Sequence, residues 1–289
     1  MKFAHLAQRL FNTPLAIHPA KAEVVMAALS DRLGISHIAH LNGHNSMALE
    51  EDYGDFRSAG TTSRNGYDLV AGVAIIPITG TLVQKLGTLR PYSGMTGYDG
   101  IRQNILAALS DPEVRALALD IDSPGGEVSG CFDLADMIYQ SRGTKPIWGI
   151  LDEAAYSAAY AIASACDYIT VPRTGGTGSI GVISMHVDWS KALDSSGFKV
   201  TFITYGDRKA DGAAEIPLSP DALVRFQSDI DTMGELFVNT VARNRALDPE
   251  TVRDTQAATY LGKSGVELGL ADIVLSPDAA FLALLETLG

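Results

Sequence analysis

The sequence predicts an α/β fold in which a parallel sheet is flanked by helices, preceded by an N-terminal helical extension. From residue 63 onward, short runs rich in β-branched and apolar residues alternate with stretches whose apolar residues recur at helical spacing. Such alternation favours parallel strands joined by helical crossovers. The chain has 289 residues, enough to bury a sizeable core.

The individual elements follow from these patterns. Residues 69–79 are β-branched and predict a buried strand. Further strands are expected at 114–121, 146–151, 168–171, 181–187 and 199–205, and helices at 98–109, 128–141 and 157–165. A long helix, buried on one face, is predicted at 220–245, where apolar residues lie three or four positions apart.

We divide the chain into a leader, residues 1–62, and a main domain, residues 63–289. The leader has helical periodicity at 20–33 and then a polar, glycine-containing stretch. No run approaches the ~20 apolar residues of a membrane span, and the first residues do not resemble a signal peptide. We therefore expect a cytoplasmic protein with no membrane partner.

Charge and composition argue against several classes of function. The net charge is −12, and nucleic-acid binding depends on clustered lysine and arginine, so we expect no nucleic-acid partner. Two cysteines, Cys131 and Cys166, are too few for a disulfide framework. His37, His40 and His44 lack a carboxylate or cysteine at ligand spacing, so no metal is expected. No organic cofactor is implied.

The first candidate for chemistry is Asp-Ser-Pro-Gly-Gly at residues 122–126, which follows a predicted strand. Ligands bind at the carboxyl ends of parallel strands. The glycines allow close backbone approach, and the N–H of Gly126 could serve in an oxyanion hole. An ordinary strand-to-helix turn is the alternative.

Ser157 is the second candidate, because it follows another predicted strand and begins an alanine-rich helix. There its hydroxyl would lie beside free backbone N–H groups, including that of Ala158. Ser157 could instead merely cap the helix.

Two polar loops complete the set. Residues 174–181 form a glycine-rich turn containing Ser179, without the Gly-Lys-Ser/Thr of a phosphate-binding loop. Residues 205–212 contain Lys209, which taken alone would be an ordinary solvated charge.

These four segments together resemble the serine-lysine peptidases related to bacterial signal peptide peptidase A, a family that includes phage prohead proteases. The resemblance covers residues 70–275, including closing segments at 260–265 and 269–272. It implies a crotonase/Clp-protease-like fold and a serine endopeptidase with a Ser-Lys dyad. The family roles then fall on Ser157 as nucleophile, Lys209 as base, Ser179 as the residue that orients the lysine, and Gly126 and Ala158 as oxyanion donors.

A lysine base must be partly buried, because free lysine is protonated at neutral pH. We expect the apolar residues 200–203 and Ser179 to provide that environment. Ala158 and Ala159 stand where bacterial members often carry glycines, so we expect a narrower pocket beside the nucleophile.

The leader resembles one branch of this family in particular. Residues 6–15, followed by His18-Pro19, are similar to the start of phage prohead proteases. This implies action on head-assembly proteins, such as scaffold or portal, in the host cytoplasm around the assembling prohead. Relatives also assemble into rings, which implies a homo-oligomer.

Other interpretations stay open. His186 could be the base of a Ser-His-Asp triad on the same fold. The chain could be a soluble bacterial signal-peptide-peptidase-like protease with unrelated substrates. It could also be a crotonase-type acyl-CoA enzyme, or a catalytically silent shell or scaffold-binding protein.

Overall fold

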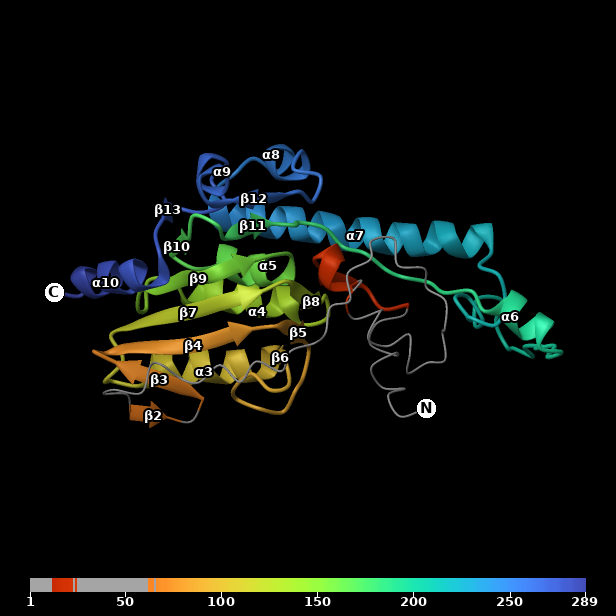
Figure 1. Cartoon of the computed structure of the whole chain (residues 1–289), viewed down its shortest axis with the longest axis horizontal. Coiled ribbons are helices and arrows are strands. Elements are labelled where there is room, and N and C mark those ends of the chain that lie inside the picture. Colours follow the sequence, from red (N-terminus) through yellow and green to blue (C-terminus); the bar gives the residue numbers. More distant parts are fainter. Residues whose placement is uncertain (1–11, 23, 25–61, 65) are drawn as a thin grey trace.

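A central sheet of mainly parallel strands forms the body of the protein (Figure 1). The computed structural model describes residues 12–22, 24, 62–64 and 66–289. Five strands run parallel in the order β4, β7, β9, β10 and β13. Their bounds are Val73–Thr79, Ala116–Ser123, Ile147–Ala155, Tyr168–Val171 and Ile273–Val274. The predicted α/β class with a parallel sheet is confirmed.

One edge of this sheet corrects the prediction of a single strand at residues 69–79. The chain instead forms two antiparallel strands, β3 (Tyr67–Val70) and β4, with β2 (Thr62–Arg64) beyond them. Ala71 and Gly72 have φ angles of 49° and 81°. Two successive positive φ values are typical of the tight turn that joins a hairpin, so the β-branched run is interrupted there.

At the other edge, β9 continues past β10 and pairs with β11 (Gly176–Gly178), which in turn pairs with β12 (Thr259–Leu261). A smaller sheet has the strand order β1-β8-β5-β6. These strands are Leu15–Ile17, Gly125–Glu127, Thr81–Val83 and Met95–Gly97. Because β1 comes from the leader, part of the leader belongs to the folded body.

Helices cover both faces of the central sheet. α3 (Tyr98–Ser110), α4 (Cys131–Ser141) and α5 (Ala158–Ser164) pack with the sheet in one large apolar core, which α7 (Pro220–Arg245) joins through buried Phe237 and Val241. α10 (Pro277–Thr287) packs on Val73, Ala116 and Ile150 in a second cluster. α8 (Pro249–Arg253) and α9 (Gly262–Glu267) are short.

The four helices expected in the main domain are all present, within a few residues of the predicted bounds. The helix expected at 20–33 lies mostly outside the described residues, of which 19–22 and 24 are helical. Among the described helices, none has both the length and the apolar character that crossing a bilayer requires.

Residues 182–219, together with the adjacent N-terminal half of α7, extend beyond the end of the sheet, and we call residues 182–219 the arm (Figure 1). The arm carries the short helix α6 (Ser190–Ser195) and is joined to α7 by an ion pair between Asp211 and Arg225 at 2.5 Å. The strands expected at 181–187 and 199–205 do not form. Ile183 makes only an isolated bridge to Leu15, and 199–205 has no strand partner among the described residues. A strand needs a neighbour for its backbone hydrogen bonds, and local β propensity does not supply one.

Candidate active site

Ser157 lies in the sharp turn between β9 and α5. Its backbone has φ 54° and ψ −120°, a conformation that non-glycine residues rarely adopt, and only 1% of the residue is exposed. A strained serine between a strand and a helix is the arrangement that presents a nucleophilic hydroxyl in many hydrolases. The Ser157 hydroxyl lies 3.4 Å from the carbonyl oxygen of Gly181.

The neighbouring strand β7 ends beside this serine. Ser123 and Ala155 are opposite each other in the β7–β9 pair, and the Tyr156 N–H donates to the Ser123 carbonyl at 3.0 Å. The Ser123 hydroxyl holds the following turn, donating to the Gly80 carbonyl at 2.6 Å and accepting from the Gly125 N–H at 3.2 Å. The parallel register therefore places the glycine turn next to the nucleophile.

Gly125 makes the close approach possible. It has φ 96°, and a Cβ atom built on it would lie 2.9 Å from the Tyr156 carbonyl oxygen and 3.0 Å from the Ala158 nitrogen. Any side chain would therefore be strained and crowded there. The structure thus brings the turn at Gly125 and Gly126 close to Ala158 and Ser157, and the roles of Gly126 and Ala158 as oxyanion donors stay predictions.

Ser179 is close to the nucleophile through the backbone. The carbonyl of the preceding residue, Gly178, accepts a hydrogen bond from the Ser157 N–H at 2.9 Å. Ser179 is 5% exposed, has φ 55°, and donates its own N–H to the Ala258 carbonyl at 2.8 Å. Its role toward a lysine stays a prediction.

Lys209 lies elsewhere, in the exposed arm loop of residues 205–209, between α6 and α7. That part of the arm is at the outer end of α7, whereas α5 lies within the body (Figure 1). The burial expected from residues 200–203 is wrong for the single chain, since Val200, Phe202 and Ile203 are 40%, 41% and 98% exposed. The structure of one chain does not bring Lys209 to Ser157.

The rival base, His186, faces the leader. Its Nδ1 lies 3.1 Å from Oδ1 of Asn12, whose Nδ2 donates to the Gly212 carbonyl at 2.8 Å. No hydrogen bond between His186 and Ser157 occurs within the described part of the chain. A triad based on His186 therefore has no geometric support in this arrangement.

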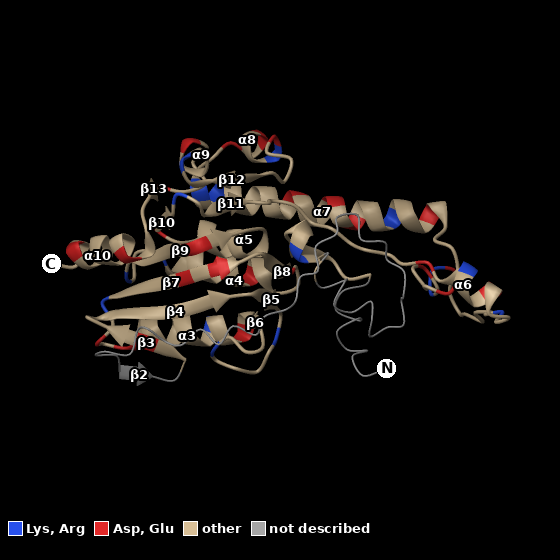
Figure 2. Ribbon diagram, viewed as in Figure 1, with Lys and Arg blue, Asp and Glu red and all other residues tan. Residues whose placement is uncertain are grey.

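The rim of the site is acidic. Asp122 lies near the carboxyl end of β7, and Asp152 and Glu153 lie near that of β9; Figure 2 shows acidic residues on both strands. Burial raises the pKa of Asp122, and the charges of Asp152 and Glu153 add to this, although a hydrogen bond from the Ala154 N–H opposes it. Burial, with Glu153 and Asp122 nearby, also raises the pKa of Tyr156.

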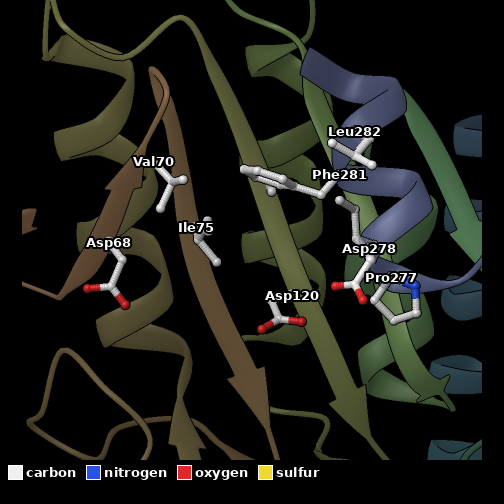
Figure 3. Close-up of a pocket in the computed structure, with 10 residues that line it drawn as sticks. Asp68, Val70, Ile75, Asp120, Pro277, Asp278, Phe281 and Leu282 are labelled. Carbon is white, nitrogen blue, oxygen red and sulfur yellow. The ribbon is translucent and has the colours of Figure 1, made fainter. Parts of the chain in front are cut away.

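A separate cavity of about 360 Å³ lies on the face of the sheet that α10 covers (Figure 3). Apolar side chains line much of it, together with Asp68, Asp120 and Asp278. Asp68 is paired with Arg90 at 2.6 Å. None of the candidate catalytic residues lines this cavity.

Metal binding receives no support from the described residues, which contain no group of three or more histidine, cysteine, aspartate and glutamate side chains arranged to hold an ion. His37, His40 and His44 lie outside them. Cys131 and Cys166 are buried free thiols.

The sequence analysis missed one part of the site. The apolar residues Leu15, Ala16 and Ile17 form β1 directly beside the glycine turn. Their position between Pro14 and Pro19 was the available signal, because prolines often bound a short extended segment.

A strained serine in a strand-to-helix turn at the carboxyl ends of parallel strands, beside a glycine turn, is the kind of site found in serine hydrolases. Comparison with known proteins identifies the family. Residues 140–288 match the model of Peptidase family S49, and the chain belongs to that family.

Two phage proteins are similar to this chain. The "Head-tail preconnector protein GP5" of Enterobacteria phage P21 is 38% identical over 283 residues, covering 96% of this chain and 56% of that protein. The "Capsid assembly protease C" of Escherichia phage lambda is 38% identical over 280 residues, covering 95% of this chain and 64% of that protein. The chain thus spans about three fifths of the length of these relatives. The predicted family resemblance is confirmed.

Among solved structures, an enoyl-CoA hydratase from Shewanella pealeana is similar with a TM-score of 0.47 and 12% identity, over 76% of this chain and 71% of that one.

Proposed function

We propose that the protein is a serine endopeptidase in which Ser157 is the nucleophile. The observation that carries this proposal is the strained turn at Ser157, with φ 54° and ψ −120°, beside the backbone of Ala158 and the glycine turn. A helix cap needs no such conformation, since a cap residue normally has extended backbone angles. Membership of Peptidase family S49 supports the same conclusion.

The chemistry follows from these positions. A neutral amine takes the proton of the Ser157 hydroxyl while its oxygen attacks the carbonyl carbon of a peptide bond. The N–H groups of Gly126 and Ala158 stabilise the oxyanion that forms. The carbon–nitrogen bond then breaks, the leaving amine takes the proton from the protonated base, and water hydrolyses the acyl-enzyme by the reverse sequence.

We assign the base to Lys209, supplied by a neighbouring copy of the chain. In one chain Lys209 is exposed on the arm, and an exposed lysine is a poor base. The same arm carries exposed apolar residues, including Phe198, Ile203 and Tyr205, which are 65%, 98% and 102% exposed. Such an extended apolar arm is typical of a segment that packs against another subunit. Packing on a neighbour would bury the amine and place it at that neighbour's Ser157.

A mixing experiment tests the assignment. Ser157→Ala and Lys209→Ala chains should each be inactive alone. Co-refolded in equal amounts, they should recover about a quarter of the wild-type rate, because one site in four pairs an intact serine with an intact neighbouring lysine. Mixing Ser157→Ala with a Ser157→Ala/Lys209→Ala chain is the control and should recover none. No recovery in the first mixture, or full activity of Lys209→Ala alone, would exclude a lysine from a neighbour.

We propose phage head-assembly proteins, such as scaffold or portal, as substrates, in the cytoplasm of the host. The support is the likeness to two phage proteins, one of which is named a capsid assembly protease. Co-expression with the neighbouring head genes and mass spectrometry of the particles would decide this. Truncations are expected with wild type and not with Ser157→Ala, and equal lengths with both would refute the proposal.

A further inference from the structure

The leader strand β1 runs along the glycine turn of the site. It pairs antiparallel with β8, with Leu15 opposite Glu127, Ala16 opposite Gly126 and Ile17 opposite Gly125. In Figure 1 the N-terminal segment that contains β1 approaches β8 from outside the central sheet. Antiparallel pairing with an exposed strand is a common way in which a protein binds an extended peptide.

The same leader segment is also held on its other side. The Leu15 N–H donates to the Ile183 carbonyl at 2.8 Å, and the Ile183 N–H donates back to the Leu15 carbonyl at 2.9 Å. The Asn12 N–H donates to the Met185 carbonyl at 2.9 Å. The segment therefore fills a groove between β8 and residues 181–185, with hydrogen bonds along both edges.

The register brings the carbonyl of Ala16 to the oxyanion donors. The His18 N–H donates to Pro124 at 2.8 Å, and the Val128 N–H donates to Pro14 at 3.3 Å. Hydrogen-bonded pairs alternate along an antiparallel ladder, so the pair between these two, Ala16 with Gly126, is also a hydrogen-bonded pair. The N–H of Gly126 accordingly faces the Ala16 carbonyl.

A second geometric relation agrees with this register. The Cβ position of Gly125 lies 2.2 Å from the Ala16 carbonyl oxygen and 3.0 Å from the Ala158 nitrogen. That oxygen and both proposed oxyanion donors are thus gathered around one point. A peptide substrate has to place the carbonyl that Ser157 attacks at this same point.

The side chains of the segment fit their surroundings closely. Leu15, Ala16 and Ile17 are 4%, 0% and 5% exposed. The His18 ring lies against Tyr156, the residue before the nucleophile, with ring centroids 5.1 Å apart. At zero exposure, the position of Ala16 leaves no room for a larger side chain without movement.

We propose that residues 14–18 occupy the peptide-binding groove of the protein's own active site, with Ala16 in the position of the substrate residue whose carbonyl is attacked. This inference rests on the proposed function, which it deepens. Substrates are extended polypeptides with a small residue before the cleaved bond. They compete with this internal strand, which has to leave the groove before they bind.

A binding experiment in the Ser157→Ala background tests the inference without depending on catalysis. The probe is a fluorescein-labelled peptide with the sequence of residues 12–19, Asn-Thr-Pro-Leu-Ala-Ile-His-Pro, followed by fluorescence anisotropy. Ala16→Trp should displace the internal strand and tighten binding of the probe by on the order of tenfold or more, since a tethered strand competes at a local concentration in the millimolar range. Ala20→Trp, at an exposed position of the same segment, is the matched control and should bind like the parent.

Two further measurements sharpen the test. Leu15→Pro removes the N–H that donates to Ile183, and should also open the groove. A probe with tryptophan in place of its alanine should not bind any variant. Circular dichroism shows which variants fold, and equal binding, or no binding, by all folded variants would overturn the inference.

Hydrolysis of a chromogenic peptide by chains that keep Ser157 tests the proposed function separately. If Ala16→Trp binds the probe but no hydrolysis depends on Ser157, the proposed peptidase function is refuted, whereas the proposal that residues 14–18 occupy the groove is supported. If hydrolysis depends on Ser157 and proceeds at equal rates in the wild type and Ala16→Trp, the peptidase function is supported, whereas the proposal that residues 14–18 occupy the groove is refuted.

Discussion

Replacing Ser157 with glycine should make the protein more stable while it abolishes activity. The φ of 54° and ψ of −120° at Ser157 suit glycine and strain every residue that has a Cβ. Ser157→Ala removes the hydroxyl and keeps that strain. Comparing the glycine and alanine variants therefore isolates the backbone energy stored at the nucleophile.

The size of the effect can be worked out. A residue held in such a region costs about 1–3 kcal/mol. Glycine relieves this cost but loses about 0.5–1 kcal/mol more backbone entropy on folding. The hydroxyl contributes little, because its contact with the Gly181 carbonyl is long, at 3.4 Å. The free energy of unfolding of Ser157→Gly should therefore be higher than that of Ser157→Ala by about 1 kcal/mol, which corresponds to a Tm higher by roughly 2–4 °C.

Urea unfolding of both variants, followed by circular dichroism, measures this difference. Ser228, exposed within α7, is the matched control, because there glycine should be less stable than alanine by about 1 kcal/mol. We therefore expect glycine to be more stable than alanine at residue 157 and less stable than alanine at residue 228. If the glycine variant is no more stable than the alanine variant at residue 157, the turn stores no strain and the argument for a specialised nucleophile loses its basis.

Three other predictions concern stability. Gly234→Ala, inside α7 with no atom within 4 Å of the added methyl group, should raise the free energy of unfolding by about 0.5–1 kcal/mol in urea titrations. Burial raises the pKa of Cys131 and Cys166 to about 12, so only the unfolded chain releases these protons as the pH rises above about 8.5. The free energy of unfolding should therefore fall between about pH 8.5 and 12, by up to about 1.4 kcal/mol per pH unit for each thiol. Cys166→Ala should make this fall with pH less steep. An equally steep fall in the variant would contradict the prediction. Arg245, 8% exposed, pairs with Asp272 at 2.8 Å, so Arg245→Ala should cost about 3–5 kcal/mol by thermal and urea unfolding, and a loss under 1 kcal/mol would show that the pair adds little.

Much of the fold could be predicted because its signals are local. The helix at Pro220–Arg245 and the strand at Tyr168–Val171 have the predicted bounds. Helical spacing and β-branched runs report directly on which face an element buries. The prediction was wrong at residues 69–79, where a two-residue turn divides one apolar run into a hairpin, and at 199–205, where no neighbouring strand is available.

By itself, the sequence determined the helices of the main domain, most of the parallel strands, the family, and the residue types of the candidate site, because strand-to-helix turns carrying glycine and serine can be recognised from a few adjacent residues. Only the tertiary structure decided which of these residues meet. Parallel register brings the turn at Gly126 to Ser157, across a separation that local patterns cannot encode. Antiparallel pairing of β1 with β8 places Ala16 of the leader opposite Gly126, whereas Lys209 lies on the arm of the same chain. Backbone pairing between segments far apart in the chain brings Gly126 and Ala16 to Ser157, and the pattern within one segment does not specify the distant segment with which it pairs.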